Sequence, residues 1–181
     1  MSANLRIAVI GMGNVLMGDD AAGPYVIETL NARFQFEYGV EAIDLGTPGL
    51  DLTPHIMGLD TLILVDTVLS DGPPGELRRY EKSALMRQTF RPRISPHDPA
   101  LAEALTLAEL TSACPRRVVL IGIIPEKCKK GTTLSPAVHR AVGDAVDAVI
   151  HELRECGAEV RFRSEPRRPN IWWEEPASCM S

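Results

Sequence analysis

The feature that most constrains the fold of this chain is a regular alternation of short apolar runs with segments of helical periodicity. The apolar, β-branched runs predict buried strands at Arg6–Ile10, Val40–Leu45, Thr61–Val65 and Arg117–Ile124. Runs without polar residues are typical of strands that are covered on both faces. The sequence therefore predicts the α/β fold class, with a mostly parallel, twisted sheet and helices on both of its faces.

Helical periodicity predicts the elements that cover this sheet. It indicates helices at Tyr25–Phe34 and Pro99–Leu110, and a shorter helix at Leu50–Met57. The last helix has the clearest limits, because Ser135 is a favourable N-cap and Gly157 can close the C-terminus in the left-handed conformation.

Two polar segments and a tail complete the domain organisation. Glu76–Tyr80 predicts an antiparallel edge strand, and Glu159–Arg163 predicts a final short strand. We expect a single domain over residues 1–163, followed by a tail over residues 164–181. The tail contains three prolines and the adjacent Trp172 and Trp173, so it is either partly disordered or docked through its indoles on the body or on a partner.

Composition excludes several classes of protein. A formal net charge of -5 argues against a nucleic-acid binder, which needs a basic face. No run of apolar residues is long enough to cross a membrane, and the start MSANLRIAVIG lacks the apolar segment of a signal peptide, so we expect a cytoplasmic protein. The four cysteines show no C-x-x-C spacing, which argues against a structural zinc site and favours incidental thiols.

Ligands of parallel α/β sheets bind beyond the carboxyl ends of the strands, so the first loop, Gly11–Asp20, is the first place to search for a site. A dinucleotide fingerprint would need a third glycine where Leu16 stands, and no Gly-Lys-Ser/Thr is present. The glycines therefore predict a tight strand exit with close backbone approach. Of the adjacent Asp19 and Asp20, we expect one to cap the following helix and the other to face the cleft. Pro24 should delay the start of that helix and leave Asp19–Gly23 as a loop.

Two further residues extend this candidate site. Asp66 directly follows an apolar strand, where a carboxylate either caps the next turn or is a metal or catalytic ligand. His97 precedes a predicted helix and lies in a loop that the fold would bring to the same edge. Asp20, Asp66 and His97 would then form a mixed oxygen and nitrogen site suited to a divalent first-row metal with open positions. The chain has neither a G-x-S-x-G nor an H-E-x-x-H motif.

Taken together, these stretches resemble the hydrogenase maturation protease family, the endopeptidases that process the large subunit of nickel–iron hydrogenases. The matching stretches occur in the order of the family and are Gly11–Asp20 with Gly23, Asp44–Gly49, Leu62–Asp66, Ser95–His97 and Val119–Glu126. One departure is Ala21, where many members have glycine. The tail after Arg163 lies outside the resemblance.

The resemblance implies a three-layer α/β/α sandwich that removes a C-terminal extension from the immature, nickel-loaded large subunit by cleaving one peptide bond. It implies that the catalytic and metal-contacting residues are Asp20, Asp66 and His97. It also links a substrate-recognition loop to Asp44, Gly46, Thr47 and Gly49.

The nickel in this interpretation is carried by the substrate and need not reside in the free protein. It would either polarise the scissile carbonyl or lower the pKa of a bound water, and the sequence leaves both roles open. Asp19 or Asp44 could serve as general base. We expect a monomer, because the surface that receives a large protein partner must stay open.

Two other function classes remain as alternatives. A phosphoacceptor receiver-like module also has an acid pair after its first strand and an aspartate at the third, and Lys127 would match its lysine, but it gives His97 no role. A metal-dependent hydrolase with a resident ion predicts metal in the purified protein and activity on small amides.

Overall fold

The computed structural model describes residues 5–48, 52–87 and 98–174, with only the backbone of residues 98–100. Its centre is a sheet of five strands in the order β3-β1-β4-β6-β5. The strands are β1 (Ile7–Gly11), β3 (Val40–Asp44), β4 (Thr61–Thr67), β6 (Arg117–Ile123) and β5 (Leu77–Glu81). β5 is antiparallel to β6 and the other neighbours are parallel, which confirms the predicted mostly parallel sheet with an antiparallel edge strand.

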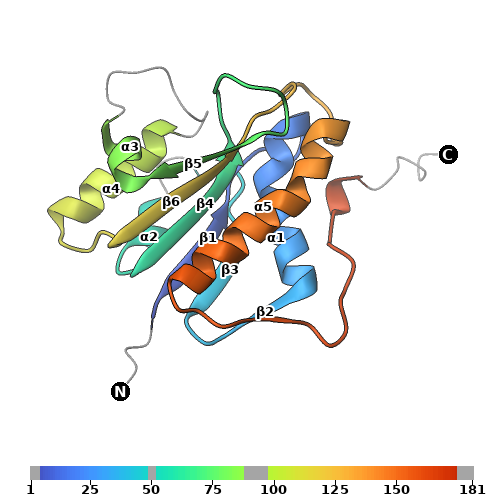
Figure 1. The fold of residues 1–181 in the computed structure, drawn as a ribbon. Coiled ribbons are helices and arrows are strands. Elements are labelled where there is room, and N and C mark those ends of the chain that lie inside the picture. Colours follow the sequence, from blue (N-terminus) through green and yellow to red (C-terminus); the bar gives the residue numbers. More distant parts are fainter. Residues whose placement is uncertain (1–4, 49–51, 88–97, 175–181) are drawn as a thin grey trace.

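Helices cover both faces of this sheet (Figure 1). α1 (Ala22–Arg33) and α5 (Pro136–Glu155) pack on one face, and α2 (Thr53–Ile56), α3 (Lys82–Met86) and α4 (Asp98–Leu110) lie on the other. Side chains of a strand alternate between the faces, so Ile63 joins the core under α1 and α5 while Leu62 joins the core under α2 and α4. The result is the three-layer α/β/α sandwich that the resemblance implies.

The first helix begins earlier than the sequence predicts. α1 starts at Ala22, and Gly18–Ala21 form a 3-10 turn (η1), so the expected loop over Asp19–Gly23 is wrong. Pro24 does not delay the helix, because it lies in the first turn, where a backbone N–H has no intrahelical partner to lose.

The C-terminal part packs on the body of the protein. β7 (Val160–Phe162) pairs with β2 (Phe34–Phe36) in a second, two-stranded antiparallel sheet, of which only the β7 segment was expected. The chain then runs back along α1 to a 3-10 turn, η4 (Trp172–Glu174), where Trp173 is buried against Tyr25. The Tyr25 hydroxyl donates to Glu174, whereas Trp172 stays exposed. Of the two outcomes left open for the indoles, Trp173 therefore docks on the body.

No helix within the described ranges combines the length and the apolar character that a membrane span requires.

Glycines allow the strand exit to pack closely on α1. A Cβ on Gly23 would lie 2.6 Å from the carbonyl oxygen of Val65 and closer still to that of Met12. A Cβ on Gly11 would meet the side chain of Ile27 and the backbone of Gly23. The absence of side chains at these positions therefore sets the distance between α1, β1 and β4.

We expect a Gly23→Ala substitution to destabilise the protein by about 3 kcal/mol, because the added methyl group overlaps two backbone carbonyls that cannot move independently of the sheet. Gly143→Ala in α5 is the matched control, since its Cβ meets nothing within 4 Å, and a gain of about 0.5–1 kcal/mol is expected there. Urea denaturation measures both values. Equal stabilities of the Gly23 variant and the wild type would contradict the packing argument.

A buried carboxylate joins α5 to the sheet. The Glu152 side chain is 5% exposed and accepts hydrogen bonds from Arg79 Nε at 2.6 Å and Arg117 Nη2 at 2.5 Å. Burial alone would raise the pKa of Glu152, but the two guanidinium groups outweigh burial and hold this pKa below its usual range.

Because the folded-state pKa of Glu152 is lowered, its ion pairs contribute stability that is present at neutral pH and is lost as the pH falls through that pKa. We expect Glu152→Gln to be less stable than the wild type near pH 7, with a gap that narrows below the ordinary carboxyl pKa of 4.5. Denaturation at several pH values tests this, with the exposed Glu155→Gln as control. A gap that is the same at neutral and strongly acidic pH would rule out this ionic contribution.

Candidate functional site

The carboxyl ends of β1 and β4 flank the topological switch point of the sheet. From β1 the chain crosses to β3 on one side, and from β3 it crosses to β4 on the other. This is the position where open α/β sheets bind ligands. Asp20 follows β1, and Asp66 lies in β4, which continues to Thr67 and so extends beyond the predicted strand end.

Asp20 and Asp66 are buried at this edge and are linked through Thr67. The Thr67 hydroxyl donates to Asp20 Oδ1 at 3.1 Å, and the Thr67 N–H donates to Asp66 Oδ1 at 2.7 Å. The other Asp20 oxygen accepts the N–H of Asn14 at 2.9 Å. Asp20 is 7% exposed and Asp66 0%. The structure thus brings these two predicted residues to one place, and one threonine orients both carboxylates.

Asp19 has a different role from its neighbour. Its carboxylate is 1% exposed and accepts three backbone N–H groups, from Glu126 at 2.8 Å, Lys127 at 3.0 Å and Ser135 at 2.6 Å. Neither η1 nor α1 has a side-chain N-cap, so the expected capping role of one of the two acids is wrong. Asp19 instead holds the loop between β6 and α5 against the loop between β1 and α1.

Further backbone contacts strengthen this junction. The Gly18 N–H donates to Gly131 O at 2.9 Å, and the Gly131 N–H donates to Leu16 O at 3.0 Å. Because every oxygen of Asp19 already faces amide donors, the geometry favours a structural role for Asp19 over that of a general base.

The junction also brings Cys128 to the carboxylates. Cys128 is exposed as a residue, but partial desolvation of its thiol raises the pKa of Cys128 to about 11. The negative charges of Asp20, Asp19 and Asp66 act in the same direction, and a hydrogen bond with Thr67 opposes them. The thiol therefore stays protonated at neutral pH. The sequence analysis treats Cys128 as an incidental thiol. Its position after β6, at the carboxyl end of a parallel strand, is the sequence feature that places it near the site.

The Asp44 loop lies beside the same site. The Gly46 N–H donates to Asp44 Oδ1 at 2.8 Å, and Gly46 O accepts the N–H of Gly13 at 2.8 Å. Gly46 has a φ of 58°, the left-handed conformation that favours glycine. Thr47 is exposed, and Gly49 lies outside the described residues. The segment therefore contacts the first loop directly through its backbone.

His97 lies outside the described residues, and α4 begins at the next residue, Asp98. Within the described part of the chain no group of three or more His, Cys, Asp and Glu side chains forms a complete metal site. Asp20 and Asp66 could supply oxygen ligands to a cation. A nearby positive charge would offset the cost of burying the two negative charges. Fold and site together define an α/β protein that holds a pair of carboxylates at the switch point of its sheet.

Comparison with known proteins shows which family the chain belongs to. A family model described as hydrogenase maturation protease matches residues 24–152. The chain is 36% identical over 159 residues to the hydrogenase 2 maturation protease of Escherichia coli, covering 86% of this chain and 94% of that protein. It is 38% identical over 152 residues to the hydrogenase expression/formation protein HoxM of Cupriavidus necator, covering 83% and 75%.

A solved structure agrees with these matches. The E. coli hydrogenase maturating endopeptidase HybD has a TM-score of 0.82 and 34% identity to this chain, with 88% of this chain and 99% of that chain covered. The protein thus belongs to the hydrogenase maturation protease family and is a peptidase. The membership confirms the resemblance seen in the sequence and leaves the receiver-like alternative without support.

We expect Asp19→Asn to destabilise the protein by about 3 kcal/mol, because an amide group turns a donor toward buried N–H groups that need an acceptor. The exposed Asp144→Asn in α5 is the control and should change stability by less than about 0.5 kcal/mol. Thermal and urea denaturation measure both. Wild-type stability of the Asp19 variant would show that the three hydrogen bonds contribute little.

Proposed function

We propose that this protein is the endopeptidase that removes a C-terminal extension from the immature, nickel-loaded large subunit of a nickel–iron hydrogenase. The observation that supports this most directly is the linked pair of buried carboxylates at the switch point, in a chain whose relatives are named hydrogenase maturation proteases. A large protein substrate would approach this edge, where the loops after β1, β3, β4 and β6 meet.

In this proposal Asp20, Asp66 and His97 contact nickel that the substrate carries. Among the described residues, each oxygen of Asp20 accepts one hydrogen bond, which leaves a lone pair on each oxygen for a cation. Carboxylate oxygen and imidazole nitrogen are suitable donors for a divalent first-row metal. Thr67 would orient both carboxylates, as residues in contact with metal ligands commonly do.

The proposed reaction is hydrolysis of one amide bond. Water adds its oxygen to the scissile carbonyl carbon, the C–N bond breaks, and the leaving amine takes a proton. The cation would stabilise the developing oxyanion or lower the pKa of the attacking water. Asp44, Gly46, Thr47 and Gly49 would recognise the substrate beside the cleavage site. We propose further that the protein acts as a cytoplasmic monomer, since the substrate-binding edge must remain accessible.

We expect His97→Ala and Asp66→Asn to lower the rate of precursor cleavage by more than about 100-fold, because each removes a contact to the cation that activates the amide. Thr67→Val should lower the rate by about 10–100-fold. The assay is intact-mass analysis of a nickel-loaded large-subunit precursor from the same source. Asp71→Asn, an exposed carboxylate in the loop after β4, is the matched control.

The metal content of each partner distinguishes a substrate-borne metal from a resident one. Enzyme treated with a chelator and then freed of it should still cleave the nickel-loaded precursor, and untreated enzyme should leave a nickel-free precursor intact. Loss of activity after chelation, with recovery on adding a divalent metal to the enzyme, would favour the resident-ion hydrolase. No cleavage of a demonstrably nickel-loaded cognate precursor would refute the proposed reaction.

A further inference from the structure

A hollow of about 810 Å³ lies at the end of the sheet opposite the carboxylates. Its walls come from the end of β5, the first turn of α3, the last turns of α4 and the start of β6, and Met86, Val118 and Val119 form its apolar part. Its size is within the range of small-ligand sites. Arg117, at the start of β6, lines the hollow, whereas Gly122 of the same strand is paired with Asp66. At 3.3 Å per residue, the hollow is therefore about 16 Å from the carboxylates along the strand.

The side chains around the hollow carry an excess of positive charge in an otherwise acidic protein. Five cationic and two acidic side chains line it: Arg79, Lys82, Arg87, Arg116, Arg117, Glu81 and Glu109. Counting the buried Glu152 that two of the arginines share, the local balance is still two positive charges, whereas the whole chain has a net charge of -5. The local excess of positive charge gives the hollow a positive electrostatic potential, which attracts anions.

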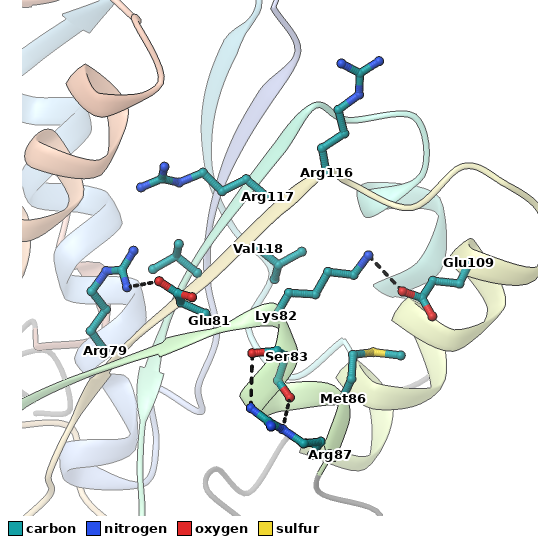
Figure 2. Close-up of a pocket in the computed structure, with 11 residues that line it drawn as sticks. Arg79, Glu81, Lys82, Ser83, Met86, Arg87, Glu109, Arg116, Arg117 and Val118 are labelled. Carbon is teal, nitrogen blue, oxygen red and sulfur yellow. Dashed lines mark hydrogen bonds and ion pairs between the residues drawn. The ribbon is translucent and has the colours of Figure 1, made fainter.

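Internal ion pairs leave part of this charge free for a ligand. Arg79 forms ion pairs with Glu81 and Glu152, and Lys82 is paired with Glu109 at 2.9 Å. Arg87 contacts only Ser83 among the described residues, and no acidic partner of Arg116 is found there. Figure 2 shows Arg116 and Arg117 on the β6 side of the hollow and Arg87 at the opposite rim.

Arg117 faces the other side of the sheet. Its Nη2 donates to the buried Glu152 of α5 at 2.5 Å, whereas its neighbour Val118 faces α4. Arg117 therefore adds positive charge to the hollow without contacting a ligand over Val118. The planar donors of Arg87 and Arg116 match phosphate and carboxylate oxygens.

We propose that this hollow binds a small polyanion, with phosphate or carboxylate oxygens held by Arg116 and Arg87. The remainder of the ligand lies over Met86 and Val118. The site is separate from the carboxylate edge, so a bound ligand leaves the cleavage site open. This inference does not depend on the proposed function.

The test is a titration of the full-length protein with pyrophosphate and, separately, with citrate, followed by NMR of ¹³C-labelled methionine and valine methyl groups. We expect saturable shifts of Met86, Val118 and Val119, with an affinity that falls as the salt concentration rises. The double variant Arg87→Gln, Arg116→Gln should bind about tenfold more weakly or worse, because it removes two guanidinium groups that form no ion pair within the described ranges. Arg154→Gln, an exposed arginine of α5, is the control with unchanged binding.

The two probes distinguish the source of the oxyanion. Binding of pyrophosphate alone identifies a phosphate ligand, binding of citrate alone identifies a carboxylate ligand, and binding of both identifies a general oxyanion site. Absence of saturation for both probes at about 10 mM, roughly the limit of specific weak binding, overturns the proposal. Binding that the double variant and Arg154→Gln weaken equally also overturns it, because the effect would then reflect net charge alone.

Discussion

The arrangement of the candidate active site depends on one buried carboxylate that does not itself face the substrate. Asp19 accepts three amide N–H groups from the segment between β6 and α5, and it thereby joins two loops that are more than a hundred residues apart in the sequence. A charged acceptor is the strongest partner that buried amides can have. This contact holds the first loop, with the next residue Asp20, against the segment that leads into α5.

Two adjacent aspartates therefore perform different tasks with the same functional group. Asp19 accepts three backbone N–H groups from one distant segment, so it acts as a structural anion. Among the described residues Asp20 accepts one hydrogen bond on each oxygen, and each oxygen can accept a further partner. Thr67 connects Asp20 to the backbone beside Asp66, so the position of one carboxylate depends on that of the other. Such coupling suits the proposed site, in which both carboxylates would contact one cation.

The two ends of the sheet carry opposite charge, although the net charge of the whole chain is negative. The carboxyl edge concentrates negative charge at Asp20 and Asp66, while the opposite end gathers five cationic side chains around the hollow at the start of β6. At the cationic end, Glu152 of α5 forms buried ion pairs with Arg79 and Arg117 and so offsets part of their charge. The sheet thus separates two surfaces of opposite sign, each suited to a different ligand.

The sequence by itself determined the five strands of the main sheet, their mostly parallel direction, the cap at Ser135 and the family, because apolar periodicity and local motifs are short-range properties. It also indicated Asp20 and Asp66, since residues that follow parallel strands meet at one edge. It could not predict that Asp19 binds Glu126, Lys127 and Ser135, that Pro24 is accepted inside α1, or that Thr67 and Cys128 lie beside the carboxylates. These features depend on contacts between distant segments, and only the packing of the loops decides which donor reaches which oxygen.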